Sequence, residues 1–232
     1  MTSYFFRFCI GLAPIDDSVE YTEKIIDFLK SLPLPFALKG KLDIHFPNKP
    51  NEHYLSKSLN RSFVDGRVGG NASIYSLQRE SLADKRVDHI YFTFDHSVAV
   101  SFADFVGVVD AFVATFPVQS VALIDEDFRD KFSDAARNLA RRRYLQDPIY
   151  DLSHGVFLFQ LLHFFSNQFC ERSFGVRSEE LYDRLNGKIP ECKMMGGGVF
   201  VRFFNELPTH EQLLEINRIF RPLIGGVGLY QE

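Results

Sequence analysis

The sequence predicts an α+β protein, in which a mixed, mostly antiparallel β-sheet carries helices packed on it. Two observations predict this class. A strand-like run is followed directly by a helix signal three times along the 232 residues, within 4–32, 89–117 and 199–223. Hydrophobic residues make up 46% and charged residues 24% of the chain, close to the average of globular domains. We therefore expect a single α+β domain, 1–232, and the likeness of 4–32 to 199–223 leaves open two similar lobes, 1–125 and 126–232.

The first strand and helix lie within residues 4–32. Residues 4–10 are aromatic and β-branched in character, which indicates a strand. From Val19 to Leu32, apolar side chains then recur at helical spacing. Asp17 followed three residues later by Glu20 matches a capping box, and Pro33 supplies a stop. The polar, turn-rich stretch 47–70 is instead predicted to form a long loop.

The second strand and helix give the clearest pattern in the chain. Apolar Ile90, Phe92 and Phe94 alternate with Tyr91 and Thr93, as in a strand. Ser101 and Asp104 can cap the following helix. Its apolar stripe consists of Phe102, Phe105, Val109, Phe112 and Phe116. Pro117 ends the helix, and residues 118–124 follow as a short buried strand.

The remaining elements follow the same rules. We expect a long helix over 127–144, a strand over 156–162 and a short helix over 178–185 that Gly187 stops. Gly196, Gly197 and Gly198 precede a strand, so a turn or a close backbone approach is favoured over a phosphate loop, and Gly69-Gly70 is interpreted in the same way. After the strand over 199–204, Thr209 and Gln212 open a helix that Pro222 and the glycines at 225, 226 and 228 end.

Composition favours a protein of the cytoplasm. The net charge of −4 favours neither nucleic acid nor an anionic membrane surface. The three cysteines are odd in number and widely spaced, which fits free thiols in a reducing compartment. The N-terminus lacks the pattern of a signal peptide, and the longest apolar run, 155–165, is too short for a membrane span.

No motif indicates catalysis, a cofactor or a metal. None of the seven histidines falls in a metal-binding spacing. Asp95, His96 and Ser97 are three catalytic residue types in a row, but the side chains of consecutive residues point apart. His163, within an apolar run, is typical of a hydrogen-bonded core histidine. We expect no enzyme, and the alternative is a small enzyme whose site is assembled from Asp95, His96 and His163.

Charged clusters suggest two kinds of partner. The basic residues 137–143 near the end of the expected long helix complement its dipole, and a nucleic-acid-associated module using this face is a second alternative. Asp16, Asp17, Glu20 and Glu23 cluster at the start of the first helix. Such an acidic surface could dock onto the basic cleft of a nuclease and raise the association rate.

Near the end of the chain, the strand Gly198–Phe203 leads through Asn205–Glu211 into a helix that closes on Leu223. Residues 147–162, the helix end at 28–32 and Leu38-Lys39-Gly40 belong to the same pattern, which covers much of the chain. This order of elements resembles the immunity protein 52 family, whose members protect bacteria from toxins. It is a resemblance of element order and apolar spacing, so no residue role is transferred.

The resemblance implies that the chain binds and neutralises a cognate toxin, a nuclease delivered by a type VI secretion system. It implies a protein partner, and from the net charge and the short apolar runs we expect no membrane and no nucleic acid. A specific interface buries about 800 Å² on each partner and depends on a few aromatic or arginine anchors. Tyr54, Phe63 and Tyr75, which lie outside the helical stripes, are the candidate anchors, beside the acidic residues at the start of the first helix.

Overall fold

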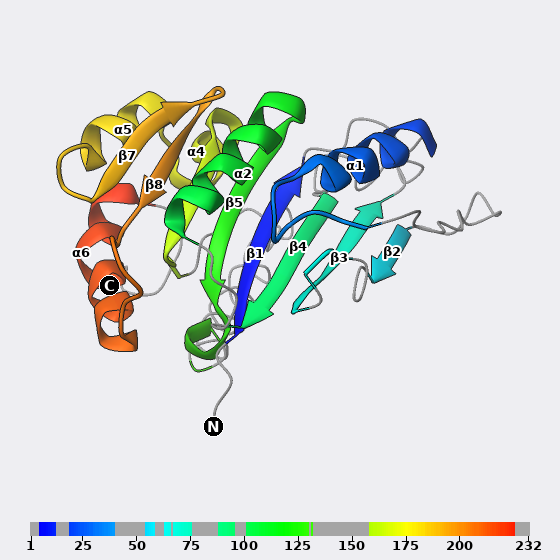
Figure 1. Ribbon diagram of the computed structural model, residues 1–232. Coiled ribbons are helices and arrows are strands. Elements are labelled where there is room, and N and C mark those ends of the chain that lie inside the picture. Colours follow the sequence, from blue (N-terminus) through cyan, green and yellow to red (C-terminus); the bar gives the residue numbers. More distant parts are fainter. Residues whose placement is uncertain are drawn as a thin grey trace. The chain divides into compact units, whose positions relative to one another are not determined.

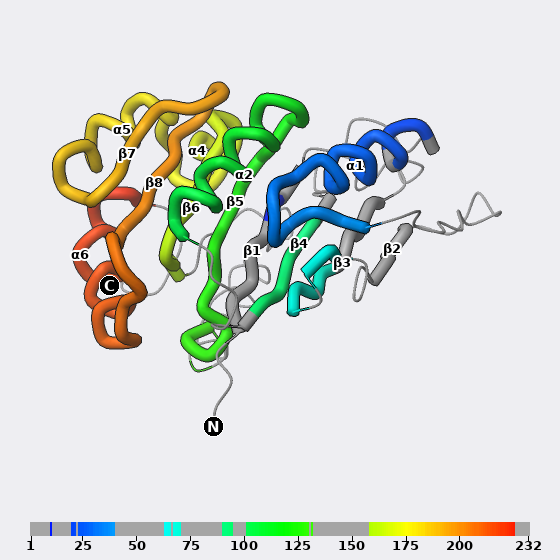
Figure 2. The backbone as a smooth tube through the Cα atoms, in the orientation of Figure 1, coloured from blue at the N-terminus to red at the C-terminus, as the bar shows by residue number. Residues whose placement is uncertain are grey.

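The computed structural model shows an α+β protein, as the sequence predicts (Figures 1 and 2). It describes residues 5–12, 19–39, 54–58, 63–65, 67–75, 88–95, 101–129, 131 and 158–225. The chain divides into two compact units, Met1–Val118 and Gln119–Glu232.

The first unit is built on four antiparallel strands in the order β2-β3-β4-β1. These strands are β1 (Phe5–Leu12), β2 (Tyr54–Ser58), β3 (Val68–Tyr75) and β4 (Asp88–Asp95). The unit also holds the helices α1 (Val19–Ser31) and α2 (Phe102–Thr115). Both helices and the strands β1 and β4 were predicted within a few residues of their bounds, because their apolar spacing is regular.

Aromatic side chains fill the core of this unit. Phe36 packs edge-on against Phe92 and Phe105, with ring centroids 5.3 and 5.6 Å apart. Phe28 of α1 meets Phe112 of α2 edge-on at 4.7 Å. Phenylalanine, with 25 residues in the chain, thus packs α1 on α2, and the ring of Phe36 contacts both β4 and α2.

The second unit has four further antiparallel strands in the order β5-β6-β8-β7. They are β5 (Val118–Asp125), β6 (Leu162–Ser166), β7 (Glu191–Met195) and β8 (Gly198–Arg202). The helices are α4 (Asn167–Phe174), α5 (Ser178–Leu185) and α6 (His210–Ile224). Val199 and Val201 of β8 join a buried cluster with Cys170, Leu181 and Leu213, one from each helix.

The glycine turn between β7 and β8 is confirmed. Gly196 and Gly197 have φ of 49° and 76°, and Met195 pairs with Gly198. A two-residue loop with positive φ at both positions is a type I′ hairpin, whose twist suits antiparallel strands.

The capping boxes of α2 and α6 are confirmed as well. The hydroxyls of Ser101 and Thr209 accept the third helical N–H, and Asp104 and Gln212 accept the N–H of the capping residue.

Three expectations were wrong. Of the strand expected at 156–162, residues 156 and 157 lie outside the described residues, 158–161 are not strand, and Leu162 begins β6. The backbone of Phe159 and the N–H of Gln160 hydrogen-bond to side chains and not to a neighbouring strand. The loop expected at 47–70 contains β2 and the start of β3, since the ladder of an edge strand needs no apolar side chain. The last helix continues through Pro222 to Ile224, so Pro222 does not end it, whereas Gly225 caps its end as expected.

Two elements were missed, α4 and β7. The helix expected at 178–185 is confirmed with the same bounds, and Gly187 follows it with a φ of 77°. Of the helix expected at 127–144, residues 127–129 and 131 are helical, and the rest lies outside the described residues.

Candidate functional site

The outer face of α1 carries the part of the predicted acidic surface that the structure describes. Glu20 and Glu23 are exposed, whereas Asp16 and Asp17 lie outside the described residues. Ile25 and Leu29, on the opposite side of the helix, are fully buried in the core of the first unit. We call Glu20 and Glu23 the acidic face of α1.

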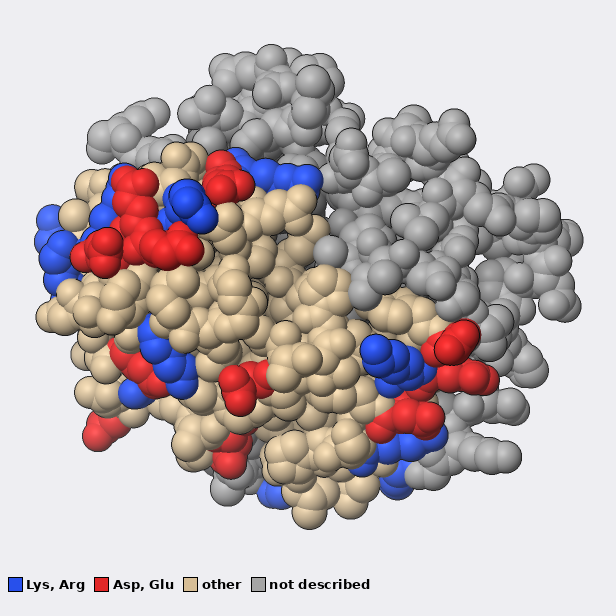
Figure 3. Space-filling model, turned by 90° about the horizontal axis from the view of Figure 1, so that it is seen from above, with Lys and Arg blue, Asp and Glu red and all other residues tan. Residues whose placement is uncertain are grey.

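Other acidic residues on the described part of the chain are of two kinds: some, including Asp110, Glu206 and Glu211, are also exposed with no ion pair among the described residues, whereas others are paired with basic side chains. Asp27, one turn after Glu23, forms an ion pair with Lys30 at 2.8 Å. On α5, Glu180 pairs with Arg184 at 2.5 Å and Glu179 lies 3.7 Å from Arg177. Acidic and basic groups are likewise interspersed in the view of Figure 3. Among the described residues, Glu20 and Glu23 form no ion pair, so their carboxylates remain available to a cationic partner.

The predicted aromatic anchors do not form one set. Phe63 is fully buried, with its ring 5.6 Å from that of Phe92, so it is a core residue and the expectation of a surface anchor there was wrong. Tyr54 and Tyr75 occupy paired positions at one end of the β2–β3 ladder. The structure thus brings these two positions together but separates them from Phe63.

His163 is a core histidine, as the sequence indicates. It lies on β6, buried, and its Nε2 accepts the N–H of Gln160 at 2.9 Å. Burial lowers its pKa to about 3, and the charge of Arg221 acts in the same direction. A histidine that stays neutral and hydrogen-bonded in the core is poorly suited to acid–base catalysis at neutral pH. His163 therefore does not fit the alternative enzyme site. Of the other two residues expected in that site, Asp95 is the last residue of β4, and His96 lies outside the described residues.

The same part of the second unit holds two buried polar residues that the sequence analysis missed. The side chain of Asn217 accepts the N–H of Phe159 at 2.6 Å and donates to its carbonyl at 2.8 Å. The guanidinium of Arg221 lies over the Phe159 ring, 3.9 Å from its centroid. Both residues are fully buried on α6. Their position on the inward stripe, four residues apart, is the signal that could have identified them.

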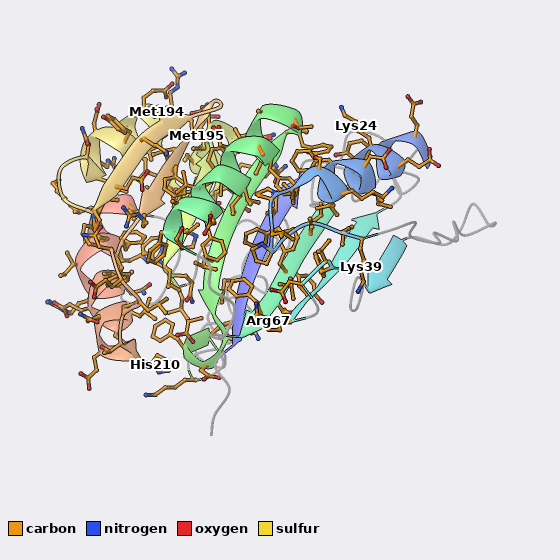
Figure 4. The ribbon with its side chains drawn as sticks, viewed as in Figure 1. Lys24, Lys39, Arg67, Met194, Met195 and His210 are labelled. Carbon is orange, nitrogen blue, oxygen red and sulfur yellow. The ribbon has the colours of Figure 1, made fainter. Side chains whose placement is uncertain are left out.

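His210 and Asp125 make the one histidine–carboxylate contact among the described residues. Their side chains are 3.7 Å apart, and His210 is labelled in Figure 4. The other oxygen of Asp125 accepts the N–H of Phe128 at 2.9 Å, so this carboxylate also caps the helical residues that follow β5. Within the described residues, no group of three or more histidine, cysteine or acidic side chains could hold a metal ion.

The thiols of the second unit are not activated. Burial raises the pKa of Cys170 to about 12 and that of Cys192 to about 11. Reactive cysteines have lowered pKa values, because the thiolate is the nucleophile. Neither residue is therefore poised for nucleophilic chemistry.

Comparisons with protein-family models, curated proteins and solved structures gave no match. The basic residues 137–143 lie outside the described residues. Across the part of the chain that is described, no helix has the length and apolar character needed to cross a membrane.

Proposed function

We propose that this protein is a cytoplasmic immunity protein, which neutralises a bacterial toxin by binding it and catalyses no reaction. The toxin is a nuclease delivered by a type VI secretion system. The observation that carries the proposal is the acidic face of α1, where Glu20 and Glu23 are exposed and form no ion pair among the described residues.

The packing of α1 supports a role in recognition. Leu29 and Ile25 are fully buried, and Phe28 packs on Phe112 and Phe116 at 4.7 and 5.1 Å. A helix fixed in this way holds its carboxylates in place before the partner arrives, which lowers the entropic cost of binding. Nucleases bind the phosphate backbone with basic residues, so an acidic surface is complementary to them and increases the association rate.

The C-terminal elements also support the proposal. The residues that carry the family resemblance form β8 and the capped helix α6, in the order that the resemblance implies. This agreement concerns the order of elements, and it supports a related role without assigning one to any side chain.

Co-expression with the product of the neighbouring gene tests the proposal. We expect the pair to co-purify as a stable complex, and cells that express the neighbouring protein to survive only when this protein is present. A matched culture with an empty vector measures the toxicity. If the neighbouring protein is harmless, or kills equally in the presence of this chain, the proposed function is wrong.

A further inference from the structure

The strand β7 forms one edge of the sheet in the second unit. The strand order β5-β6-β8-β7 pairs it with β8 alone. Met194, one of the five residues of β7, is 42% exposed. Figure 4 shows Met194 and Met195 at the end of the hairpin. An exposed edge strand is a template on which another strand can pair.

The register of the hairpin defines which backbone groups face outward. Because Met195 and Gly198 flank the two-residue turn, they form a hydrogen-bonded pair, and hydrogen-bonded pairs then alternate along the ladder. The backbone N–H and C=O groups of Lys193 and Glu191 therefore also hydrogen-bond to β8. The N–H and C=O groups of Cys192 and Met194 point away from the sheet, and within the described residues no other strand pairs with them.

The side chains of β7 alternate between two faces. Glu191 and Lys193 share the face of Phe200, since Lys193 lies over the Phe200 ring at 5.2 Å and Glu191 bonds Arg202 at 3.0 Å. Cys192 lies on the other face, under α5, where its thiol is 4.0 Å from the carbonyl oxygen of Tyr182. A strand that extends this sheet must offer charges on the first face and apolar groups on the second.

A second copy of β7 meets this requirement in one antiparallel register. Two-fold symmetry allows three registers that pair the outward groups of Cys192 and Met194. With Cys192 opposite itself, Glu191 of each copy faces Lys193 of the other. With Cys192 opposite Met194, the two Lys193 side chains face each other, which is repulsive. With Met194 opposite itself, the glycine turns enter the ladder and no charge pair forms.

We propose that two copies of this protein associate through β7, in the register that places Cys192 opposite Cys192 of the second copy. Each copy donates the N–H of Cys192 to the Cys192 carbonyl of the other, and the N–H of Met194 to the carbonyl of Pro190. Pro190 has no N–H to donate, so in this pair the carbonyl of Met194 gains no partner from the second copy. Two cross-strand Glu191–Lys193 pairs flank the two-fold axis. The acidic residues of α5, next to this edge, are already paired with Arg177 and Arg184, which limits the repulsion between copies.

The interface is small. A five-residue edge buries less than the roughly 1,600 Å² of a standard interface, so the dimer is weak and exchanges rapidly. We expect a dissociation constant on the order of 0.1 mM, and the edge is covered only where the local concentration is high.

Sedimentation velocity over a series of concentrations up to about 1 mM tests the dimer. We expect a reversible shift from monomer to dimer in the wild type. Lys193→Glu replaces the two attractive pairs between copies by two repulsive ones, and it also removes the Lys193–Glu191 ion pair of 3.0 Å within each copy. It should therefore weaken association about tenfold or more. Lys193→Arg, which keeps the charge, should leave association unchanged. Met194→Pro removes an outward N–H that the fold does not use and should also weaken the dimer.

Cys192 reports the register directly. Each Cys192 thiol lies under α5 with its pKa raised to about 11, so a short bismaleimide should join two wild-type chains only slowly and faster at raised pH, and Cys192→Ser should abolish this product. Retained thermal unfolding temperatures show that the variants are folded. A purely monomeric wild type, a dimer that Lys193→Glu and Met194→Pro leave intact, or a cross-link that persists in Cys192→Ser would each overturn the proposal. None of these results depends on a toxin, so the proposed function stands or falls separately.

Discussion

At the scale of single residues, Gly198 shows how closely two strands approach in the second unit. A Cβ atom built at this position would lie 2.4 Å from the carbonyl oxygen of Phe165 and 2.7 Å from the Phe164 ring. Both neighbours are fixed, because Phe165 lies in the β6 ladder and Phe164 is fully buried. The glycine is therefore required by packing and not by its φ angle.

Gly198→Ala is expected to destabilise the protein by about 3 kcal/mol or more, because the ladder must shift to admit the methyl group. Gly107→Ala on the exposed side of α2 is the matched control. Nothing lies within 4 Å of a Cβ there, so this change should stabilise the protein by about 1 kcal/mol. Urea unfolding measures both values. Equal effects of the two substitutions would contradict this account of Gly198.

His163 makes stability depend on pH. Its folded pKa of about 3 lies below the ordinary value of 6.5, because the protonated ring would be buried. The unfolded chain therefore takes up the proton first as the pH falls. The stability that neutral His163 contributes is complete above about pH 6.5 and is lost progressively toward pH 3, at up to about 1.4 kcal/mol per pH unit.

His163→Gln keeps an acceptor for the N–H of Gln160 but cannot titrate. Between about pH 7 and pH 5, the wild type should lose about 2 kcal/mol more of its free energy of unfolding than this variant does. Urea unfolding at the two pH values gives the comparison. A variant whose stability falls as steeply as that of the wild type would show that His163 is not the responsible group.

At the scale of elements, the sequence predicted what depends on local pattern. The capping boxes at Ser101 and Thr209, the apolar stripe of α2 and the glycine turn before β8 are all local, and all are confirmed. The strand β6 was misplaced because an apolar run alone does not show which of its residues pair. The residues that pair depend on Asn217, 58 residues away, whose side chain accepts the backbone N–H of Phe159. The candidate site also separates into what local sequence predicts and what it does not. The exposure of Glu20 and Glu23 was predicted, whereas the burial of Phe63 depends on its contact with Phe92, which is distant in the sequence.

Asn217 should anchor the segment before β6 to α6. It holds both backbone groups of Phe159 and also donates to the carbonyl of Leu213 at 2.8 Å. Asn217→Ala leaves the buried N–H and C=O of Phe159 without this partner, and should cost about 3 kcal/mol. Hydrogen exchange should show faster exchange at Phe159 and unchanged protection in β7. Uniformly faster exchange over the whole second unit would mean that Asn217 supports global stability only.

At the scale of the whole molecule, the two units share an order of elements. In the first unit, β1 and α1 precede the β3–β4 pair, β1 pairs with β4, and α2 follows. In the second, β6 and two helices precede the β7–β8 pair, β6 pairs with β8, and α6 follows. On this comparison α6 corresponds to α2, and both begin with a capping box, whereas the sequence likeness had matched α6 with α1. That the two are similar lobes of common origin stays a prediction.

The last prediction concerns how charge directs the proposed complex. If the acidic face of α1 attracts the toxin, Glu20→Lys combined with Glu23→Lys should lower the association rate constant with the neighbouring gene product at least about tenfold at low salt. The effect should shrink as salt is added, since exposed charges are screened within about 10 Å at 0.1 M ionic strength. Dissociation should change less.

The matched control reverses Glu179 and Glu180 on α5, which changes the net charge by the same amount in the other unit. Both carboxylates already lie beside arginines. Stopped-flow association at two salt concentrations separates the two variants. If both slow the association equally, the effect follows from net charge, and the acidic face of α1 is not where the toxin docks.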